Sequence, residues 1–273
     1  MILMGVLNVT PDSFSDGGSF LHPELGARHA RRLVADGAEI VDVGGESTRP
    51  GARAVSADEE LARIGPVLER IAADDVRVSI DTSKLAVAEA ALDAGAEIVN
   101  DVTAFRAEPE LAELCAERGC GVVLMHMLGT PRTMQDDPTY DDVVDEVKAF
   151  LAERIGFALA AGISEERIWV DPGIGFGKTL DHNLALLRRL GELRELGRPI
   201  CVGTSRKSFI GKITGREMDE RLGGTIASNV IALANGAEVF RVHDVRPVRE
   251  ALKVAAAILD PRAVAVVDER LSA

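Results

Sequence analysis

The stretch from Ile168 to Lys178 combines residue types that are suited to holding a ligand. It reads Ile-Trp-Val-Asp-Pro-Gly-Ile-Gly-Phe-Gly-Lys, and its apolar start is typical of a parallel strand buried on both faces. Asp171 ends that strand, Pro172 removes a backbone donor, and the following glycines permit backbone angles that other residues avoid. An acid in this place favours recognition of a ligand donor over an ordinary capped connection.

The end of this stretch also has features of a nucleotide-binding P-loop. Gly177-Lys178-Thr179 matches the last part of that motif, but Pro172 stands where the motif requires its first glycine. That glycine opens the anion-binding nest, whereas a proline brings no N–H group to a phosphate. The sequence therefore argues against a nucleoside triphosphatase.

Eight strand-and-helix units are predicted along the chain from short apolar runs and from apolar residues at helical spacing. The predicted strands cover residues 2–9, 40–43, 76–80, 98–99, 121–125, 168–171, 199–202 and 239–242. The predicted helical segments cover residues 23–36, 57–73, 85–94, 109–118, 140–161, 184–196, 206–235 and 245–259.

This alternation predicts a parallel sheet, and eight units of this total length predict a closed (β/α)8 TIM barrel. We expect a single domain over residues 1–273, with the barrel at about 2–259 and a short tail at 260–273. Gly-Ala pairs before three strands fit helix ends that lead directly into the next strand. The alternative is a doubly wound open sheet, which would need fewer strands or a reversal point.

Polar residues stand where nearly every predicted strand ends. They are Asn8, Asp42, Asp81, Asn100 with Asp101, His126, Asp171, and Arg241 with His243, and Gly203 ends the seventh strand. In barrels of this kind the chemistry lies at the C-terminal ends of the strands. The sequence therefore predicts a ring of site residues at that end.

The acids and the amide of this ring suit a flat heterocycle with several N–H donors. Asp81, Asn100 and Asp171 offer acceptor oxygens, and each acid can accept two adjacent donors. The alternative for each acid is that it caps amides of its own loop. Four cations predicted on the same face are suited to an anion: Arg49, Lys207, Arg241 and His243.

Asn8 is the predicted metal ligand of the ring. Its side-chain oxygen suits Mg²⁺, which takes few protein ligands and completes its shell with phosphate oxygens and water. The polar segment 10–18 that follows has the composition expected of a mobile lid. Residues with zinc spacing are missing, and His126 and His243 belong to different units, so zinc is disfavoured.

Composition narrows the class of protein further. A net charge of −13 argues against general nucleic-acid binding but leaves an anionic small substrate open. No apolar run reaches membrane-spanning length, and Met1 to Met4 lacks the basic flank of a signal peptide. Cys115, Cys120 and Cys201 form no metal or redox spacing, so we expect reduced thiols and a cytoplasmic location.

Eight motifs follow one another in a familiar order. They cover residues 4–18, 44–51, 79–82, 99–102, 124–127, 171–178, 205–209 and 241–245. The first, Met-Gly-Val-Leu-Asn-Val-Thr-Pro-Asp-Ser-Phe-Ser-Asp-Gly-Gly, is long enough to be highly specific. Together they closely resemble the dihydropteroate synthase family of the folate pathway.

The resemblance implies a homodimeric barrel enzyme that joins 4-aminobenzoate to a dihydropterin methyl diphosphate with Mg²⁺ as cofactor. The implied pterin ligands are Asp81, Asn100, Asp171 and Lys207; the implied diphosphate ligands are Thr48, Arg241 and His243; and Asn8 is the implied Mg²⁺ ligand. The implied aminobenzoate pocket comprises Thr48, Pro50, Phe176, Lys207 and Ser208, and Arg49, Met125, Gly203 and Val242 complete the substrate-binding set. The implied catalytic residues are Asp81, Asp171, Lys207, Arg241 and His243.

The chemistry of the residues agrees with this implication. Breaking a bond from a methylene carbon to diphosphate needs charge stabilisation on the leaving group more than a strong base. Departures from the family pattern are a short N-terminus, a bulky turn at residues 103–106, and Thr204.

Two other functions stay open from the sequence. One is a related barrel that binds reduced folates for methyl transfer, although it should lack residues 10–18 and 205–209. The other is an inactive paralogue that binds pterin.

Overall fold

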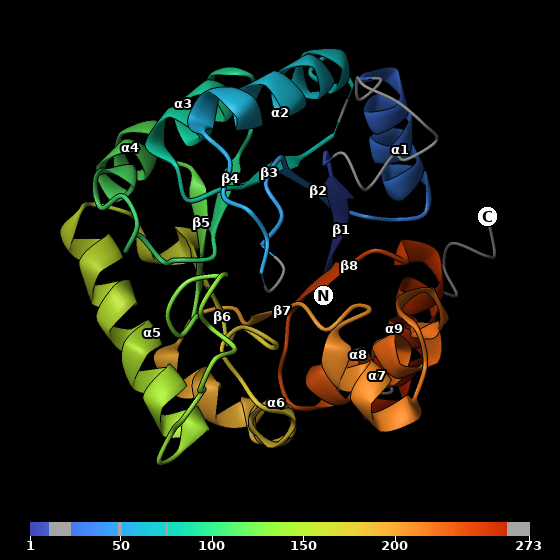
Figure 1. Cartoon of the computed structure of the whole chain (residues 1–273). Helices are drawn as coiled ribbons and strands as arrows, with labels where there is room; N and C mark the ends of the chain where they lie inside the picture. The colour runs from blue at the N-terminus through green and yellow to red at the C-terminus, as the bar shows by residue number, and fades with distance from the viewer. Residues whose placement is uncertain (11–22, 49–50, 75, 261–273) are drawn as a thin grey trace.

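The chain folds into a barrel of eight parallel strands (Figure 1). The computed structural model describes residues 1–10, 23–48, 51–74 and 76–260. The strands are β1 Ile2–Asn8, β2 Ile40–Gly44, β3 Val78–Asp81, β4 Ile98–Asp101, β5 Gly121–Met125, β6 Ile168–Asp171, β7 Cys201–Val202 and β8 Val239–Val242. Strands β1 to β6 pair in chain order, and β1 also pairs with β8, which pairs with β7.

The barrel closes between β6 and β7 through a narrow seam. Val170 and Ile200 form an isolated parallel bridge, and the N–H of Val170 donates to the carbonyl of Pro199 at 3.0 Å. The predicted closed (β/α)8 barrel is therefore confirmed, and the alternative of an open doubly wound sheet is wrong.

Helices surround the strands as an outer ring (Figure 1). They are α1 Pro23–Ala35, α2 Ala57–Ile71, α3 Leu85–Asp93, α4 Glu110–Arg118, α5 Val143–Ala160, α6 Leu180–Arg188, α7 Ser208–Thr214, α8 Leu222–Ala234 and α9 Val245–Leu259. Short 3-10 helices cover Glu165–Arg167, Leu190–Leu196 and Met218–Glu220. Among the described residues, none of the helices combines the length and the apolar character that crossing a membrane requires.

The helix predicted at residues 184–196 has the wrong bounds. Helix α6 begins at Leu180 because the Thr179 side chain accepts a hydrogen bond from the N–H of His182, while His182 Nδ1 accepts from the N–H of Thr179, both at 3.2 Å. This capping box was missed because histidine replaces the usual Glu or Gln. The helix ends at Arg188, and a 3-10 helix over Leu190–Leu196 follows it.

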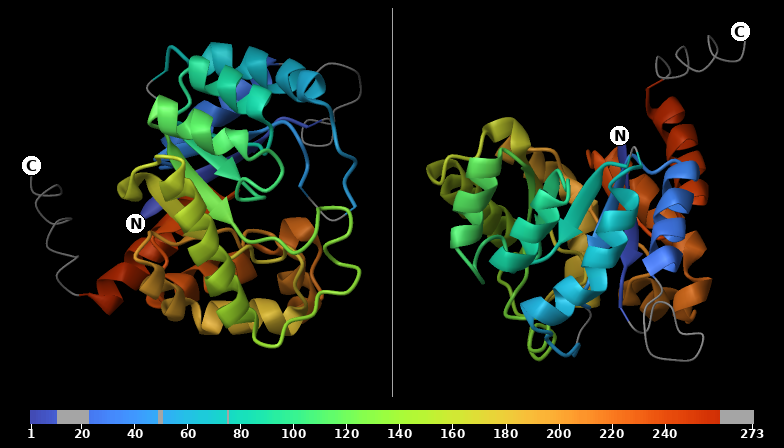
Figure 2. Two further views of the ribbon diagram at one scale, coloured as in Figure 1. Left: turned by 90° about the vertical axis from the view of Figure 1, so that its left-hand side faces the viewer. Right: turned by 90° about the horizontal axis from the view of Figure 1, so that it is seen from above.

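Glycines with positive φ end helices at the floor of the barrel, as the Gly-Ala pairs predicted. Gly37, Gly95 and Gly236 have φ angles of 104°, 99° and 97°. After α1, the N–H of Gly37 donates to the carbonyl of Val34 at 2.9 Å, which turns the chain toward β2. Figure 2 shows the N-terminus at this end, opposite the long loops that follow β2 and β5.

Candidate active site

The side chains inside the barrel form an apolar layer near the N-terminal ends of the strands (the floor). The next inward-facing layer, toward the C-terminal ends (the mouth), is mostly polar. Six floor residues form a buried apolar cluster: Met4, Ile40, Ile98, Val123, Cys201 and Val239. Because side chains alternate across a strand, the residue two positions further also faces the interior. On β2, β4, β5, β8 and the loop after β7, the residue two positions after the floor residue forms the next layer. These residues are Asp42 after Ile40, Asn100 after Ile98, Met125 after Val123, Arg241 after Val239 and Gly203 after Cys201. Strand register alone thus places an acid, an amide and a guanidinium in one layer of the barrel mouth.

Arg241 lies between two acids of this layer. Its Nε donates to Asp42 Oδ2 at 2.6 Å, and its Nη2 donates to Asp81 Oδ2, also at 2.6 Å. The amide of Asn100 donates to the same Asp42 oxygen at 3.2 Å. Since the side chains of Asp42 and Asp81 are almost fully buried, these charge-assisted bonds fix the guanidinium firmly.

One carboxylate oxygen of each acid is left over. Oδ1 of Asp42 and Oδ1 of Asp81 are buried and have no hydrogen-bond partner. Burial raises the pKa of Asp81, while the charge of Arg241 acts in the opposite direction. A buried acceptor without a partner costs free energy, so N–H donors of a ligand would relieve that cost.

Asp171 is fixed by the loop that follows it. Its Oδ1 accepts a hydrogen bond from the N–H of Gly173 at 2.7 Å. Gly173 has φ 68°, and a Cβ atom there would lie 1.8 Å from the carbonyl oxygen of His126. Only glycine fits this close approach, which explains why a glycine follows the Asp-Pro pair.

Lys207 reaches from the loop after β7 to the loop after β6. Its Nζ donates to the carbonyl of Ile174 and lies 4.6 Å from the ring centroid of Phe176. Burial lowers the pKa of Lys207 to about 8, and the neighbouring Asp171 opposes that shift. A Cβ atom at Gly203 would lie 3.7 Å from this Nζ, so the glycine leaves space beside the amine.

His243 is held by Ser205. The Ser205 hydroxyl oxygen accepts the backbone N–H of His243 at 3.2 Å and lies 3.0 Å from its Nδ1. Next to it, Arg206 has φ 59° and binds both carboxylate oxygens of Asp244 at 2.9 and 2.6 Å. This ion pair holds the left-handed backbone of Arg206 and with it the turn that carries Ser205.

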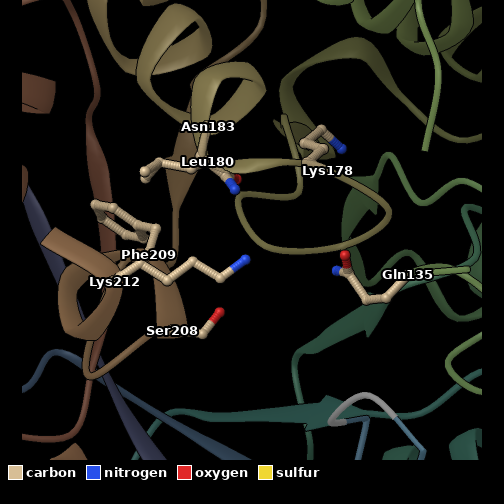
Figure 3. A pocket seen from close by; sticks show the side chains of 7 residues that line it. All are labelled: Gln135, Lys178, Leu180, Asn183, Ser208, Phe209 and Lys212. Carbon is tan, nitrogen blue, oxygen red and sulfur yellow. The ribbon is translucent and has the colours of Figure 1, made fainter. Parts of the chain in front are cut away.

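A cavity of about 230 Å³ lies where the loops after β5 and β6 meet α6 and α7 (Figure 3). It is lined by Gln135, Lys178, Leu180, Asn183, Ser208, Phe209 and Lys212. Figure 3 shows the Ser208 hydroxyl and the Lys212 amine on one wall, facing Gln135 and Asn183. The cavity offers polar donors beside the exposed Ser208.

Lys178 is buried in the wall of this cavity. Its Nζ lies 2.9 Å from Nδ1 of His126 and donates to the carbonyl of Phe176 at 3.0 Å. Burial and the lysine charge lower the pKa of His126 to about 2, so the imidazole stays neutral and its Nδ1 accepts. Lys178, whose sequence neighbourhood only partly matches a P-loop, fixes the backbone at Phe176.

Asp101 and Thr204 are polar residues near strand ends whose side chains bond to other parts of the chain. Asp101 accepts from the N–H of Thr103 at 2.7 Å and from the N–H of Phe105 at 2.6 Å, and it so supports the bulky turn. Thr204 is buried and accepts from Ser228 at 2.9 Å and from Asn229 at 3.0 Å. Asp101 thereby holds its own turn, whereas Thr204 connects the loop after β7 to α8.

The remaining predicted residues lie near the mouth, in the core, or outside the residues that the structure describes. Asn8 at the end of β1 and Thr48 in the loop after β2 are half-buried, and Met125 packs with Phe176 in a small apolar cluster. Val242 is an exception, because its side chain belongs to the core between strands and helices. Only its backbone can face the mouth. Arg49 and Pro50, like the predicted lid at 10–18, fall outside the described residues apart from Thr10.

Two residues of the site, Lys178 and Ser205, were not predicted, and Asp42 was predicted as a member of the strand-end ring without a role of its own. Asp42 was recognised as a strand-end acid, and its two-residue offset from the floor residue Ile40 is the signal that would have assigned it to the interior. For Lys178 and Ser205 the local sequence carries no such signal, because their partners His126 and His243 lie 52 and 38 residues away.

Comparison with known proteins identifies the family. The family model described as pterin binding enzyme matches residues 4–243. Dihydropteroate synthase of Escherichia coli K12 is 48% identical over 261 residues, which cover 95% of this chain and 92% of that protein.

Solved structures give the same result. Dihydropteroate synthase of Xanthomonas albilineans with 4-aminobenzoic acid has a TM-score of 0.89 at 48% identity, covering 95% of this chain and 93% of that one. The structure from the same organism in complex with 7,8-dihydropteroate has a TM-score of 0.86 at 44% identity, covering 95% and 94%. This chain therefore belongs to the dihydropteroate synthase family of pterin-binding enzymes.

Proposed function

We propose that the chain condenses 4-aminobenzoate with (7,8-dihydropterin-6-yl)methyl diphosphate to give 7,8-dihydropteroate and diphosphate. The observation that carries this proposal is the pair of buried, unpartnered oxygens on Asp42 and Asp81 beneath a mouth lined by cations. A related enzyme, 48% identical, has been solved with 4-aminobenzoic acid, and another structure from that organism holds 7,8-dihydropteroate.

Asp81, Asn100, Asp171 and Lys207 hold the pterin in this proposal. The pterin edge carries several N–H donors, and acids in a buried layer accept them with little competition from water. Lys207 supplies the complementary donor for the pterin carbonyl, since its Nζ donates to the carbonyl of Ile174 at the same place. Met125 contributes an apolar wall, and Gly203 leaves room beside the amine.

The leaving group determines the chemistry. The C–O bond between the methylene carbon and the diphosphate breaks while the amine nitrogen of aminobenzoate attacks that carbon. The arylamine is already neutral at physiological pH, so charge stabilisation on the diphosphate contributes more than a general base. Arg241, His243 and Thr48 supply that stabilisation, and Asp81 and Asp171 stabilise positive charge that develops on the pterin.

The aminobenzoate lies between Lys207, Phe176 and Ser208 in this proposal, with Thr48, Arg49 and Pro50 contributing from the loop after β2. The Ser208 hydroxyl is exposed beside the cavity of Figure 3 and is suited to the carboxylate. Phe176 offers its ring face to the aromatic ring of the substrate, at a position fixed through Lys178.

Mg²⁺ fits the site only together with the diphosphate. In the part of the chain that the structure describes, no group of three or more His, Cys, Asp and Glu residues could hold a metal. Asn8 offers one amide oxygen, and Mg²⁺ is commonly held by few protein ligands plus phosphate oxygens. Asn8 would thus hold the ion, which when bound neutralises charge on the departing diphosphate.

We also propose a cytoplasmic homodimer. The three cysteines are free and buried, as in a reducing compartment. Exposed apolar side chains gather on α8 and α9, far from the mouth: Ile231, Val254, Ile258 and Leu259. A face of this kind is suited to a second copy of the chain. Sedimentation of the purified protein measures the mass and decides this point.

Turnover tests the proposed activity. The purified chain with both substrates and Mg²⁺ should release diphosphate and 7,8-dihydropteroate in equal amounts. Lys207→Met should abolish most of this turnover, whereas Lys253→Met, an exposed lysine on α9, should retain it. Pterin binding without product in the wild-type protein would instead establish an inactive paralogue.

A further inference from the structure

Glu46 ties together the two ends of the loop that follows β2. It lies two residues after the end of the strand and two residues before Thr48. Its Oε1 accepts the backbone N–H of Val55 at 3.3 Å, just before helix α2. One carboxylate thus connects the start of the loop, next to Thr48, with the residue at its end.

The other oxygen of Glu46 is anchored to the barrel. Oε2 accepts a hydrogen bond from Nζ of Lys84, which stands directly before α3. The same Nζ donates to Oε2 of Glu60 at 2.5 Å, and the Glu60 side chain is fully buried on α2. A single lysine therefore connects the loop to two helices.

The start of the loop has little freedom to move away from α2. The carbonyl of Gly45 accepts from Nη1 of Arg63 at 2.6 Å. A Cβ atom at Gly45 would lie 2.8 Å from Ile64 Cγ2 and 2.9 Å from Glu60 Cγ, so the backbone lies directly against the helix. Because Glu46 directly follows Gly45, this contact also restricts the position of the Glu46 backbone.

The far part of the loop rests on the opposite side of the mouth. The N–H of Gly51 donates to the carbonyl of Pro131 in the loop after β5, at 3.2 Å. Figure 1 shows the segment after β2 extending over the barrel mouth. Thr48 follows the anchored Glu46 by two residues, so its position depends on the contacts of Glu46.

We propose that Glu46 is a positioning residue, held by Lys84, that places Thr48 for the aminobenzoate step. This inference rests on the proposed function, because Thr48 has a substrate only if the chain makes dihydropteroate. A different reading of the same contacts is that Lys84 merely balances the buried charge of Glu60. The two carboxylates of this lysine allow the readings to be separated.

Glu46→Ala and Glu60→Gln form a matched pair of variants. Each leaves Lys84 with one carboxylate partner, but only the first removes the bond to Val55. With Glu46→Ala we expect the KM for aminobenzoate to rise at least about tenfold, since a charge-assisted anchor is lost. The amide hydrogen of Val55 should exchange faster, and the Kd of a pterin without diphosphate, which does not contact Thr48 in the proposed complex, should stay within about twofold. Glu60→Gln should leave all three values unchanged.

Two results would overturn the inference. One is an unchanged Val55 exchange rate and aminobenzoate KM in Glu46→Ala. The other is an equal fall of kcat/KM in both variants in proportion to a lower Tm, which would make the lysine a charge-balancing residue only. Because Val55 exchange is measured without substrate and wild-type turnover is measured separately, failure of the anchor and failure of the proposed function give distinct results. Glu46→Gln, which can still accept from Val55, should restore the exchange rate.

Discussion

Nη2 of Arg241 lies 2.6 Å from Oδ2 of Asp81, so an ion pair joins β8 to β3 across the barrel mouth. In the proposed complex the two residues serve different parts of one substrate, Asp81 the pterin and Arg241 the diphosphate. The charge of Arg241 opposes the rise in the pKa of Asp81 that burial causes, and the pair leaves Oδ1 of Asp81 for a ligand. In that proposed complex this ion pair couples pterin recognition to diphosphate recognition, and Asp42 holds the same guanidinium from its other edge.

Asp42→Asn should lower kcat/KM by about tenfold to a hundredfold, the value of a charge-assisted hydrogen bond. The substitution keeps the volume but removes the charge that Arg241 Nε contacts. Steady-state kinetics with both substrates provides the measurement. Ser79→Ala is the control, because the buried Ser79 hydroxyl also lies inside the barrel but has no partner to lose. Wild-type kinetics in Asp42→Asn would show that Asp81 alone positions Arg241.

Asp171→Asn should weaken binding of the pterin diphosphate by about 1.5–3 kcal/mol, because one acceptor and one charge are exchanged for an amide. An asparagine oxygen can still accept from Gly173, so the loop should keep its shape. Isothermal calorimetry measures the affinity, with Asp181→Asn on the exposed face of α6 as the control. Equal affinity in wild type and Asp171→Asn would remove this residue from the pterin site.

His243→Ala should reduce affinity for diphosphate and for the pterin diphosphate by about tenfold, while a pterin without diphosphate binds as before. Ser205→Ala should change the same two ligands in the same direction, since Ser205 orients the imidazole. Arg241→Ala should differ from both. It leaves Asp42 and Asp81 unpaired, so all three ligands and the Tm should be affected. Losses of equal size for every ligand in His243→Ala would indicate general damage instead.

The pH dependence of turnover should report on Lys207. Burial lowers its pKa to about 8, and only the protonated amine carries the charge over Phe176. The value of kcat/KM should therefore fall as the pH rises through about 8, and Lys207→Arg should shift that fall to higher pH. The titration of Lys207 should affect the stability of the fold in the opposite direction from its effect on kcat/KM. The folded chain releases the proton before the unfolded chain, whose lysine keeps the ordinary pKa of 10.5, so the free energy of unfolding rises with pH between these values.

The sequence predicted the fold because its signals are local. Apolar strands, helical spacing and Gly-Ala pairs each act within a few residues, and together they allow few other arrangements. The helix start at Thr179 was missed because a histidine completes the cap, and Val242 was included although strand alternation points its side chain away from the mouth. The order of the motifs along the chain identified the family, and the family model confirms it over residues 4–243.

The network beneath the ligands could not be predicted in the same way. Arg241 contacts Asp42 over 199 residues of sequence, and Lys84 contacts Glu46 over 38. Such pairs depend on which strands and loops become neighbours in the closed barrel. The sequence around a charged residue does not indicate which distant residue it contacts in the folded chain.

The order of substrate binding gives the last prediction. Aminobenzoate is small and singly charged, and it offers too little surface to fix residues of several loops by itself. Lys207 donates to the carbonyl of Ile174 and lies over the ring of Phe176, so part of the proposed pocket is engaged with itself. The pterin diphosphate, or pterin with free diphosphate and Mg²⁺, supplies the charge that Thr48 and Arg49 require.

Titration of aminobenzoate alone into the purified chain should give no measurable heat. Adding pterin, diphosphate and Mg²⁺ should restore binding. Tight binding of aminobenzoate alone would show that its pocket is preformed and would rule out the ordered mechanism.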